Sequence, residues 1–170
     1  SNDSAGSKQR SLAIALAYAE AGAAIGCAAR TQSEIEAVAA AIRARGGQAV
    51  AIPVDVTDRA AVQRMTEDVV AEWGGLDILL INAGVNLDRR TVEESVAEDW
   101  MGTLNVNLSG AYFCAQAAIP HLKARGGGKI ITTGSGMGHR GNPERSAYCV
   151  SKAGLWMLTR VLAQELWPEN

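Results

Sequence analysis

A tyrosine and a lysine four residues apart, Tyr148 and Lys152, are the residues of this sequence best suited to chemistry. On a helix, positions i and i+4 share one face, so the ammonium can lie beneath the phenol and favour its ionised form. Such a phenol can give a proton to a carbonyl oxygen or take one back from an alcohol. Taken alone, the pair is also typical of a solvated helix surface.

Two polar residues earlier in the chain strengthen the chemical interpretation. Ser135 lies in a glycine-rich loop after a strand, and Asn107 lies on an earlier helix. Each has a structural alternative, because a serine suits a turn and an asparagine can bend a helix by bonding to the backbone. The conjunction of all these positions in one chain favours a catalytic site. His121 and His139 have no partner pattern and are expected at the surface.

Composition narrows the class of protein. The 170 residues are 48% hydrophobic and 20% charged, which fits a single α/β domain over residues 1–170. A net charge of -2 gives no basic surface for nucleic acid. Three unpaired cysteines suggest neither disulfides nor a zinc site, and no metal is expected. With no long apolar stretch, we expect no membrane span and no secretion signal, and a cytoplasmic location.

Helical and strand patterns alternate along the chain. We expect strands at Ala23–Ala29, Ala49–Val54, Asp77–Asn82 and Lys129–Thr133. We expect helices at Leu12–Ala21, from a Ser33–Glu36 capping box, from Asp58, over about 97–124 and over about Ser146–Leu166. Strands separated by helices predict a doubly wound parallel sheet of the Rossmann-like type, in three layers.

Several short motifs, in order and at matching spacing, resemble the short-chain dehydrogenase/reductase family. They are Asp55-Val56-Thr57, Asn82-Ala83-Gly84, Asn105-Val106-Asn107-Leu108, Ser135, and Tyr148 with Lys152-Ala153-Gly154. The resemblance runs from Leu12 to the C-terminus. It implies hydride transfer between a nicotinamide cofactor and a small carbonyl or alcohol substrate, in a homodimer or homotetramer.

The resemblance also implies roles for individual residues. Tyr148 would exchange the proton, while Lys152 would assist it and hold the nicotinamide ribose. Ser135 would bond the substrate oxygen, and Asn107 would hold a water that links Lys152 to solvent.

Four further residues are expected to bind cofactor: Arg30, Asp55, Val56 and Asn82. Arg30 follows a strand at the place where the adenine ribose would lie, and Ala29 replaces the acidic residue that would bond a 2′-hydroxyl. A guanidinium there suits a 2′-phosphate, so NADP(H) is favoured over NAD(H). The alternative is a solvated arginine.

The sequence departs from the family at its glycine-rich turn. If a helix begins at Leu12, that turn falls on residues 4–11, where all three signature glycines are replaced. Lys8 and Arg10 could compensate with charge. The central first strand of the sheet is not encoded, and residues 4–11 are not expected to form a phosphate-binding turn. We therefore expect a longer parent polypeptide, and a catalytically impaired, family-derived interaction protein or a fragment remains the alternative function.

Overall fold

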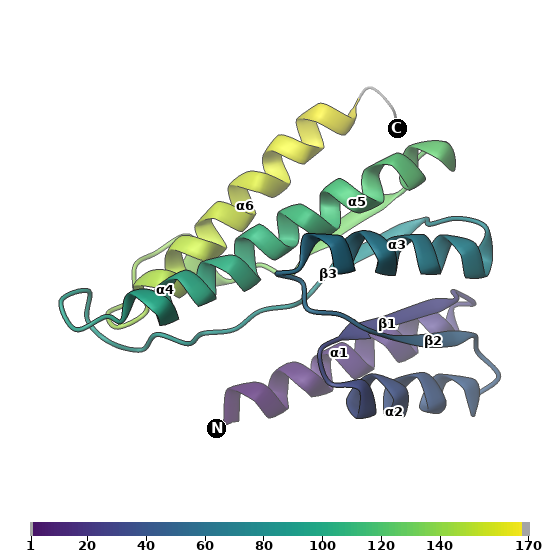
Figure 1. Cartoon of the computed structure of the whole chain (residues 1–170), viewed down its shortest axis with the longest axis horizontal. Helices are drawn as coiled ribbons and strands as arrows, with labels where there is room; N and C mark the ends of the chain where they lie inside the picture. Colours follow the sequence, from purple (N-terminus) through teal and green to yellow (C-terminus); the bar gives the residue numbers. More distant parts are fainter. Residues whose placement is uncertain (1, 168–170) are drawn as a thin grey trace. The chain divides into compact units, whose positions relative to one another are not determined.

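The computed structural model describes residues 2–167, with the side chains of residues 2–8 and 10 left aside. The chain divides into two compact units, Ser1–Asp55 and Val56–Asn170 (Figure 1). Each unit combines parallel strands with helices, as the sequence predicts. The single domain over residues 1–170 stays a prediction.

The first unit packs two helices against two parallel strands. Its elements are α1 (Asn2–Glu20), β1 (Ile25–Ala29), α2 (Gln32–Arg43) and β2 (Ala49–Pro53). β1 and β2 run in parallel, with Ile25 opposite Ala49 and Ala29 opposite Pro53. One face of α2 supplies most of the core, which consists of Cys27, Ile35, Ala39, Ile42 and Ala49.

Two expectations for this unit were wrong in detail. α1 begins at Asn2 rather than at Leu12, so residues 4–11 are helical. The segment lacks the three glycines of the family's turn, and the good helix formers among its residues are Ala5, Lys8, Gln9 and Arg10. The side chains of Lys8 and Arg10 lie outside the described part. The absence of a phosphate-binding turn over residues 2–11 is confirmed.

The Ser33–Glu36 capping box was also wrong. α2 starts at Gln32 with Thr31 as its N-cap, and no side chain makes the capping bond. The backbone N–H groups of Glu34 and Ile35 donate to the carbonyl oxygen of Thr31 instead. The first turn is therefore closed by backbone bonds.

The second unit carries the longer helices. Its elements are α3 (Arg59–Trp73), β3 (Ile78–Ile81), α4 (Ala97–Leu104), a π-helical segment (Asn105–Ser109), α5 (Gly110–Ala124), β4 (Lys129–Thr132), a 3-10 turn (Gly136–Gly138) and α6 (Ser146–Leu166). Figure 1 shows α4 continuing into α5, with α6 running beside them. The predicted helical region over about 97–124 is thus interrupted by one π-helical turn.

Local signals fix the ends of α3 and the packing of α5. Asp58 caps α3 by accepting the N–H of Ala61 at 3.0 Å, and Gly74 ends the helix in the left-handed conformation, with φ of 75°. α5 buries mainly small side chains, Cys114 among them. Gly110 begins α5 where a Cβ would lie 2.7 Å from Val56 Cγ2, so only glycine admits Val56 this closely.

The described strands form two separate parallel pairs, β1 with β2 and β3 with β4. In β3 and β4, Ile78 lies opposite Lys129 and Ile81 opposite Thr132. Within the described residues no strand pairs with both β1 and β3, as expected if the first strand is not encoded. No described helix is both long enough and apolar enough to cross a bilayer.

Candidate active site

Polar residues gather where β3 and β4 end. Because the strands are parallel, their carboxyl ends lie at one edge, and Asn82 and Thr133 follow there. The Thr133 hydroxyl donates to Asn82 Oδ1 at 2.8 Å. Thr133 was not singled out from the sequence, although its position directly before the glycine-rich loop could have identified it.

Lys152 reaches this edge from α6. Lys152 is only 4% exposed, and its Nζ donates to the carbonyl oxygen of Thr133 at 2.7 Å. In the described part of the chain no carboxylate pairs with this ammonium, and burial lowers the pKa of Lys152. A charged amine is thus held in a largely dry place by a backbone oxygen.

Tyr148 lies one helical turn before Lys152. The predicted stacking occurs, since Lys152 Nζ lies 5.8 Å from the centroid of the Tyr148 ring. Tyr148 is half-buried.

Asn107 is buried in the π-helical segment and bonds to protein groups. Its Oδ1 accepts the N–H of Val85 at 2.7 Å. Its Nδ2 donates to Val85 O at 2.9 Å and to Ser151 Oγ at 3.0 Å. Ser151 Oγ in turn donates to the carbonyl oxygen of Tyr148 at 2.8 Å. Asn107 is therefore joined to the tyrosine backbone through Ser151, a buried residue that sequence reasoning missed despite its place next to Lys152.

Gly84 lies between the asparagine and the lysine. A Cβ at Gly84 would be 3.5 Å from Asn107 Oδ1 and 3.7 Å from Lys152 Nζ. The missing side chain leaves room beside the ammonium.

Ser135 lies on the loop that packs against α6 at Lys152. Its backbone is extended, and its Oγ accepts the N–H of Met137 at 3.2 Å. Three residues later, a Cβ at Gly138 would lie 2.8 Å from the carbonyl carbon of Lys152, so loop and helix touch at backbone level. The second unit thus brings Asn82, Asn107, Tyr148 and Lys152 into one bonded neighbourhood, with Ser135 on the adjoining loop.

The remaining predicted residues divide between the units. Arg30 and Asp55 follow β1 and β2 at the carboxyl ends of those strands, and both are exposed. The strand ends are tied by the N–H of Val54, which donates to Ala29 O at 3.0 Å. Val56 belongs to the second unit and packs on Gly110.

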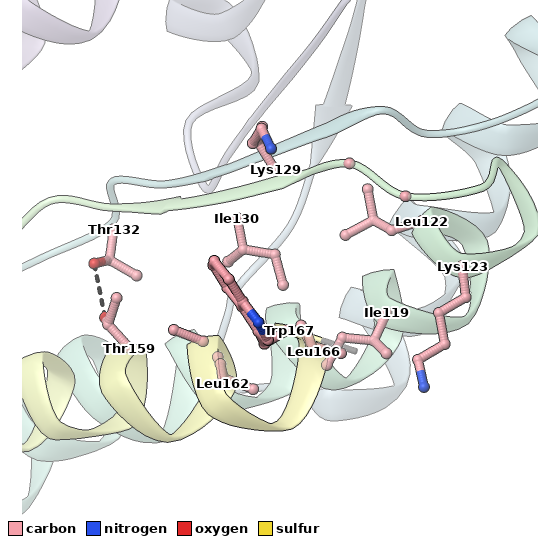
Figure 2. Close-up of a pocket in the computed structure, with 13 residues that line it drawn as sticks. Ile119, Leu122, Lys123, Lys129, Ile130, Thr132, Thr159, Leu162, Leu166 and Trp167 are labelled. Atoms are coloured by element: carbon pink, nitrogen blue, oxygen red, sulfur yellow. Dashed lines mark hydrogen bonds between the residues drawn. The ribbon is translucent and has the colours of Figure 1, made fainter. Parts of the chain in front are cut away.

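An apolar cavity of about 230 Å³ lies elsewhere in the second unit, among α5, β4 and α6 (Figure 2). Ile130 and Leu162 lie on its wall, and a 2.9 Å bond between the hydroxyls of Thr132 and Thr159 borders it. No predicted site residue lines this cavity. Among the described residues, no group of histidine, cysteine and acidic side chains could hold a metal ion.

Comparison with known proteins identifies relatives along most of the chain. The family model described as short chain dehydrogenase matches residues 10–170. The 3-oxoacyl-(acyl-carrier-protein) reductase FabG of Staphylococcus aureus is 36% identical over 131 residues, which are 77% of this chain and 53% of the relative. The chain therefore spans about half the length of the curated relatives it matches.

Solved structures agree with this match. A 3-ketoacyl-ACP reductase from Sinorhizobium meliloti 1021 superposes with a TM-score of 0.89 at 33% identity, covering 94% of this chain and 64% of that one. An NAD+-bound xylitol dehydrogenase gives 0.91 at 32% identity, covering 94% and 61%. The predicted doubly wound α/β fold is confirmed.

Proposed function

This chain belongs to the short chain dehydrogenase family, and we propose that it interconverts a carbonyl compound and a secondary alcohol. A bound nicotinamide cofactor would supply the hydride. The observation that carries the proposal is the buried ammonium of Lys152, 5.8 Å from the Tyr148 ring. This arrangement places a hydroxyl that can exchange a proton beside a cation that can bind the cofactor.

Each polar residue of the site has a part in this proposal. Tyr148 donates its proton to the carbonyl oxygen, and takes it back in the reverse direction. Ser135 donates a hydrogen bond to the same oxygen and stabilises the charge that develops there. Asn107 holds the Lys152 end of the site in place through Val85 and Ser151, and its segment is where a water could resupply the proton.

The residues fit the nicotinamide end of a cofactor better than its pyrophosphate. Gly84 leaves space beside Lys152 Nζ, which has further N–H groups to offer a ribose hydroxyl. Asn82 lies at the same edge. By contrast, residues 4–11 form part of α1, a conformation that does not cradle phosphate as a glycine-rich turn does.

For the adenosine end we propose NADP(H) rather than NAD(H). Arg30 is an exposed cation at the end of β1, suited to a 2′-phosphate. Asp55 and Val56 would contact the adenine. We also propose a homodimer or homotetramer, in which the exposed apolar side chains of α6, such as Trp156 and Met157, would be covered.

The helical conformation of residues 4–11 favours a second candidate, a non-catalytic interaction protein. Titration of the chain with NADPH, followed by nicotinamide fluorescence, separates the two. Saturable enhancement together with NADPH-dependent reduction of any carbonyl supports the enzyme. Absence of both at millimolar cofactor would overturn it and leave the interaction protein.

A further inference from the structure

The segment that follows Gly84 is fixed to the helices beside it. Asn107 bonds both backbone groups of Val85, and Thr103, one turn earlier, accepts the N–H of Leu87 at 3.2 Å. Thr103 and Asn107 are both buried. Asn86, between these two anchored residues, is therefore held in one backbone position.

Asn86 links this segment to the start of α6. Only one of the two orientations of the Asn86 amide satisfies both of its polar groups. In that orientation its nitrogen donates to Asp88 O at 3.0 Å and its oxygen accepts from Arg145 Nη1 at 2.6 Å. Arg145 is partly buried and is the N-cap of α6, just outside the helix and three residues before Tyr148 in sequence. Glu144, just before it, has φ of 59°, a strained conformation that persists where surroundings hold it and is frequent at binding sites.

The nearby acids do not neutralise Arg145. Asp99 Oδ2 accepts from Arg90 Nη2 at 3.0 Å, and Asp88, which is 1% exposed, accepts from Ser95 and lies 3.9 Å from Arg90 Nη1. Both carboxylates thus lie next to the guanidinium of Arg90. In the described part of the chain, Arg145 has a neutral amide as its acceptor and no carboxylate partner. A partly buried charge without a counter-charge is costly, and proteins usually pair it.

We infer that Arg145 binds a carboxylate carried by the substrate, and thereby selects oxo acids and hydroxy acids over neutral carbonyl compounds. This rests on the proposed function, because Arg145 contacts Asn86 in the segment that follows Gly84, and Gly84 lies beside Lys152 Nζ. A guanidinium held at one nitrogen by Asn86 still presents N–H groups to a planar, singly charged anion. The next residue, Ser146, has a buried hydroxyl with no hydrogen-bond partner in the described structure. This hydroxyl is a second donor beside Arg145.

The test compares acids with their neutral analogues. Pyruvate, acetoacetate and levulinate are each assayed beside their methyl esters, by kcat/KM with NADPH and by titration calorimetry with the cofactor present. We expect at least one acid to exceed its ester by about tenfold or more, as one charge-assisted contact provides. Arg145→Gln should reduce that ratio about tenfold, mainly through KM, and Arg145→Lys should keep part of it.

Arg140→Gln is the matched control, since Arg140 is an exposed arginine of the same loop. It should keep the ratio. A wild-type chain that turns over esters as well as acids would overturn the inference while leaving the proposed function intact. Acids that bind in an Arg145-dependent way without turnover would support the inference and count against the enzyme. A ratio unchanged in a folded Arg145→Gln chain would also overturn the inference.

Discussion

At the scale of residues, the site depends on a lysine whose charge is held by a carbonyl oxygen rather than by an acid. Lys152 donates to Thr133 O, and its Nζ lies 5.8 Å from the centroid of the Tyr148 ring. An ammonium in this position is costly to the fold and useful to a neighbouring phenol. Two variants and a pH series test these consequences.

Replacement of Tyr148 by phenylalanine should abolish most turnover. The change deletes the proton donor and little volume, so we expect kcat to fall at least about 100-fold while the fold is retained. Steady-state reduction of a carbonyl substrate measures the loss, and far-UV circular dichroism checks the fold. Tyr112→Phe is the control, because Tyr112 is 46% exposed and bonds only Gln116. Near wild-type rates in Tyr148→Phe would refute the role.

The stability of the chain should rise with pH because of Lys152. Burial lowers the pKa of Lys152 below its ordinary value of 10.5, so the folded chain binds fewer protons than the unfolded chain between the two values. The free-energy cost of burying the charged ammonium is present at neutral pH and is lost as the pH approaches 10.5. We therefore expect the Tm of the wild type to rise relative to that of Lys152→Met as the pH is raised from neutral towards 10.5. A constant Tm difference would contradict the burial effect.

Arg30 decides the expected cofactor preference. Arg30→Asp removes the charge that suits a 2′-phosphate and adds repulsion, so the ratio of kcat/KM for NADPH over NADH should fall by about tenfold or more. Arg64→Asp makes the same charge change at an exposed position on α3 and should leave the ratio unchanged. Equal ratios in the two variants would show that Arg30 is a solvated surface residue.

At the scale of elements, side chains of α4 and the π-helical segment hold the neighbouring loop. Thr103 and Thr66 are both buried and both donate to the carbonyl oxygen four residues earlier, at 2.9 and 3.0 Å. Only Thr103 also accepts a loop N–H, from Leu87. Thr103→Val should therefore reduce the free energy of unfolding by about 1–3 kcal/mol, and Thr66→Val by less. Urea unfolding measures the free energy of unfolding of both variants. Equal losses would show that the bond from the Leu87 N–H to Thr103 does not contribute to stability.

Most elements could be predicted from the sequence, because apolar periodicity and capping residues specify them locally. α6 has the predicted bounds, Ser146–Leu166, and Asp58 caps α3 as expected. The start of α1 was missed, because the apolar helical pattern begins at Leu12 and the polar residues before it carry no apolar periodicity. The π-helical turn at Asn107 was missed as well, because Asn107 bonds to Val85, 22 residues away, and local sequence patterns do not show such contacts.

The sequence predicted the kind of site correctly but did not identify all of its residues. Tyr148 and Lys152 follow from helical spacing alone. Thr133 and Ser151 adjoin recognised motifs in the sequence, but their bonds to Lys152 and Asn107 become visible only in three dimensions. The Arg145 contact with Asn86 likewise joins two loops far apart in sequence.

At the scale of the whole molecule, the two units should differ in local stability. The first unit has only 55 residues and a two-stranded sheet, and three of the five residues of β1 are exposed. Units of this size bury a small share of their surface and are marginal. We expect hydrogen exchange, followed by mass spectrometry, to be faster in β1 and β2 than in α5 and α6. Uniform protection along the chain would contradict this difference.

The burial of two of the three cysteines has a practical consequence. Cys27 and Cys114 are buried, and burial raises the pKa of both thiols, that of Cys114 to about 11. Cys149 is half-buried and adjoins Tyr148 in sequence. Because the thiolate is the nucleophile that attacks a maleimide, and because Cys27 and Cys114 are buried with raised pKa values, a maleimide dye would select Cys149 at neutral pH. The natural sequence thus carries its own attachment point for a fluorescent reporter one residue from the tyrosine.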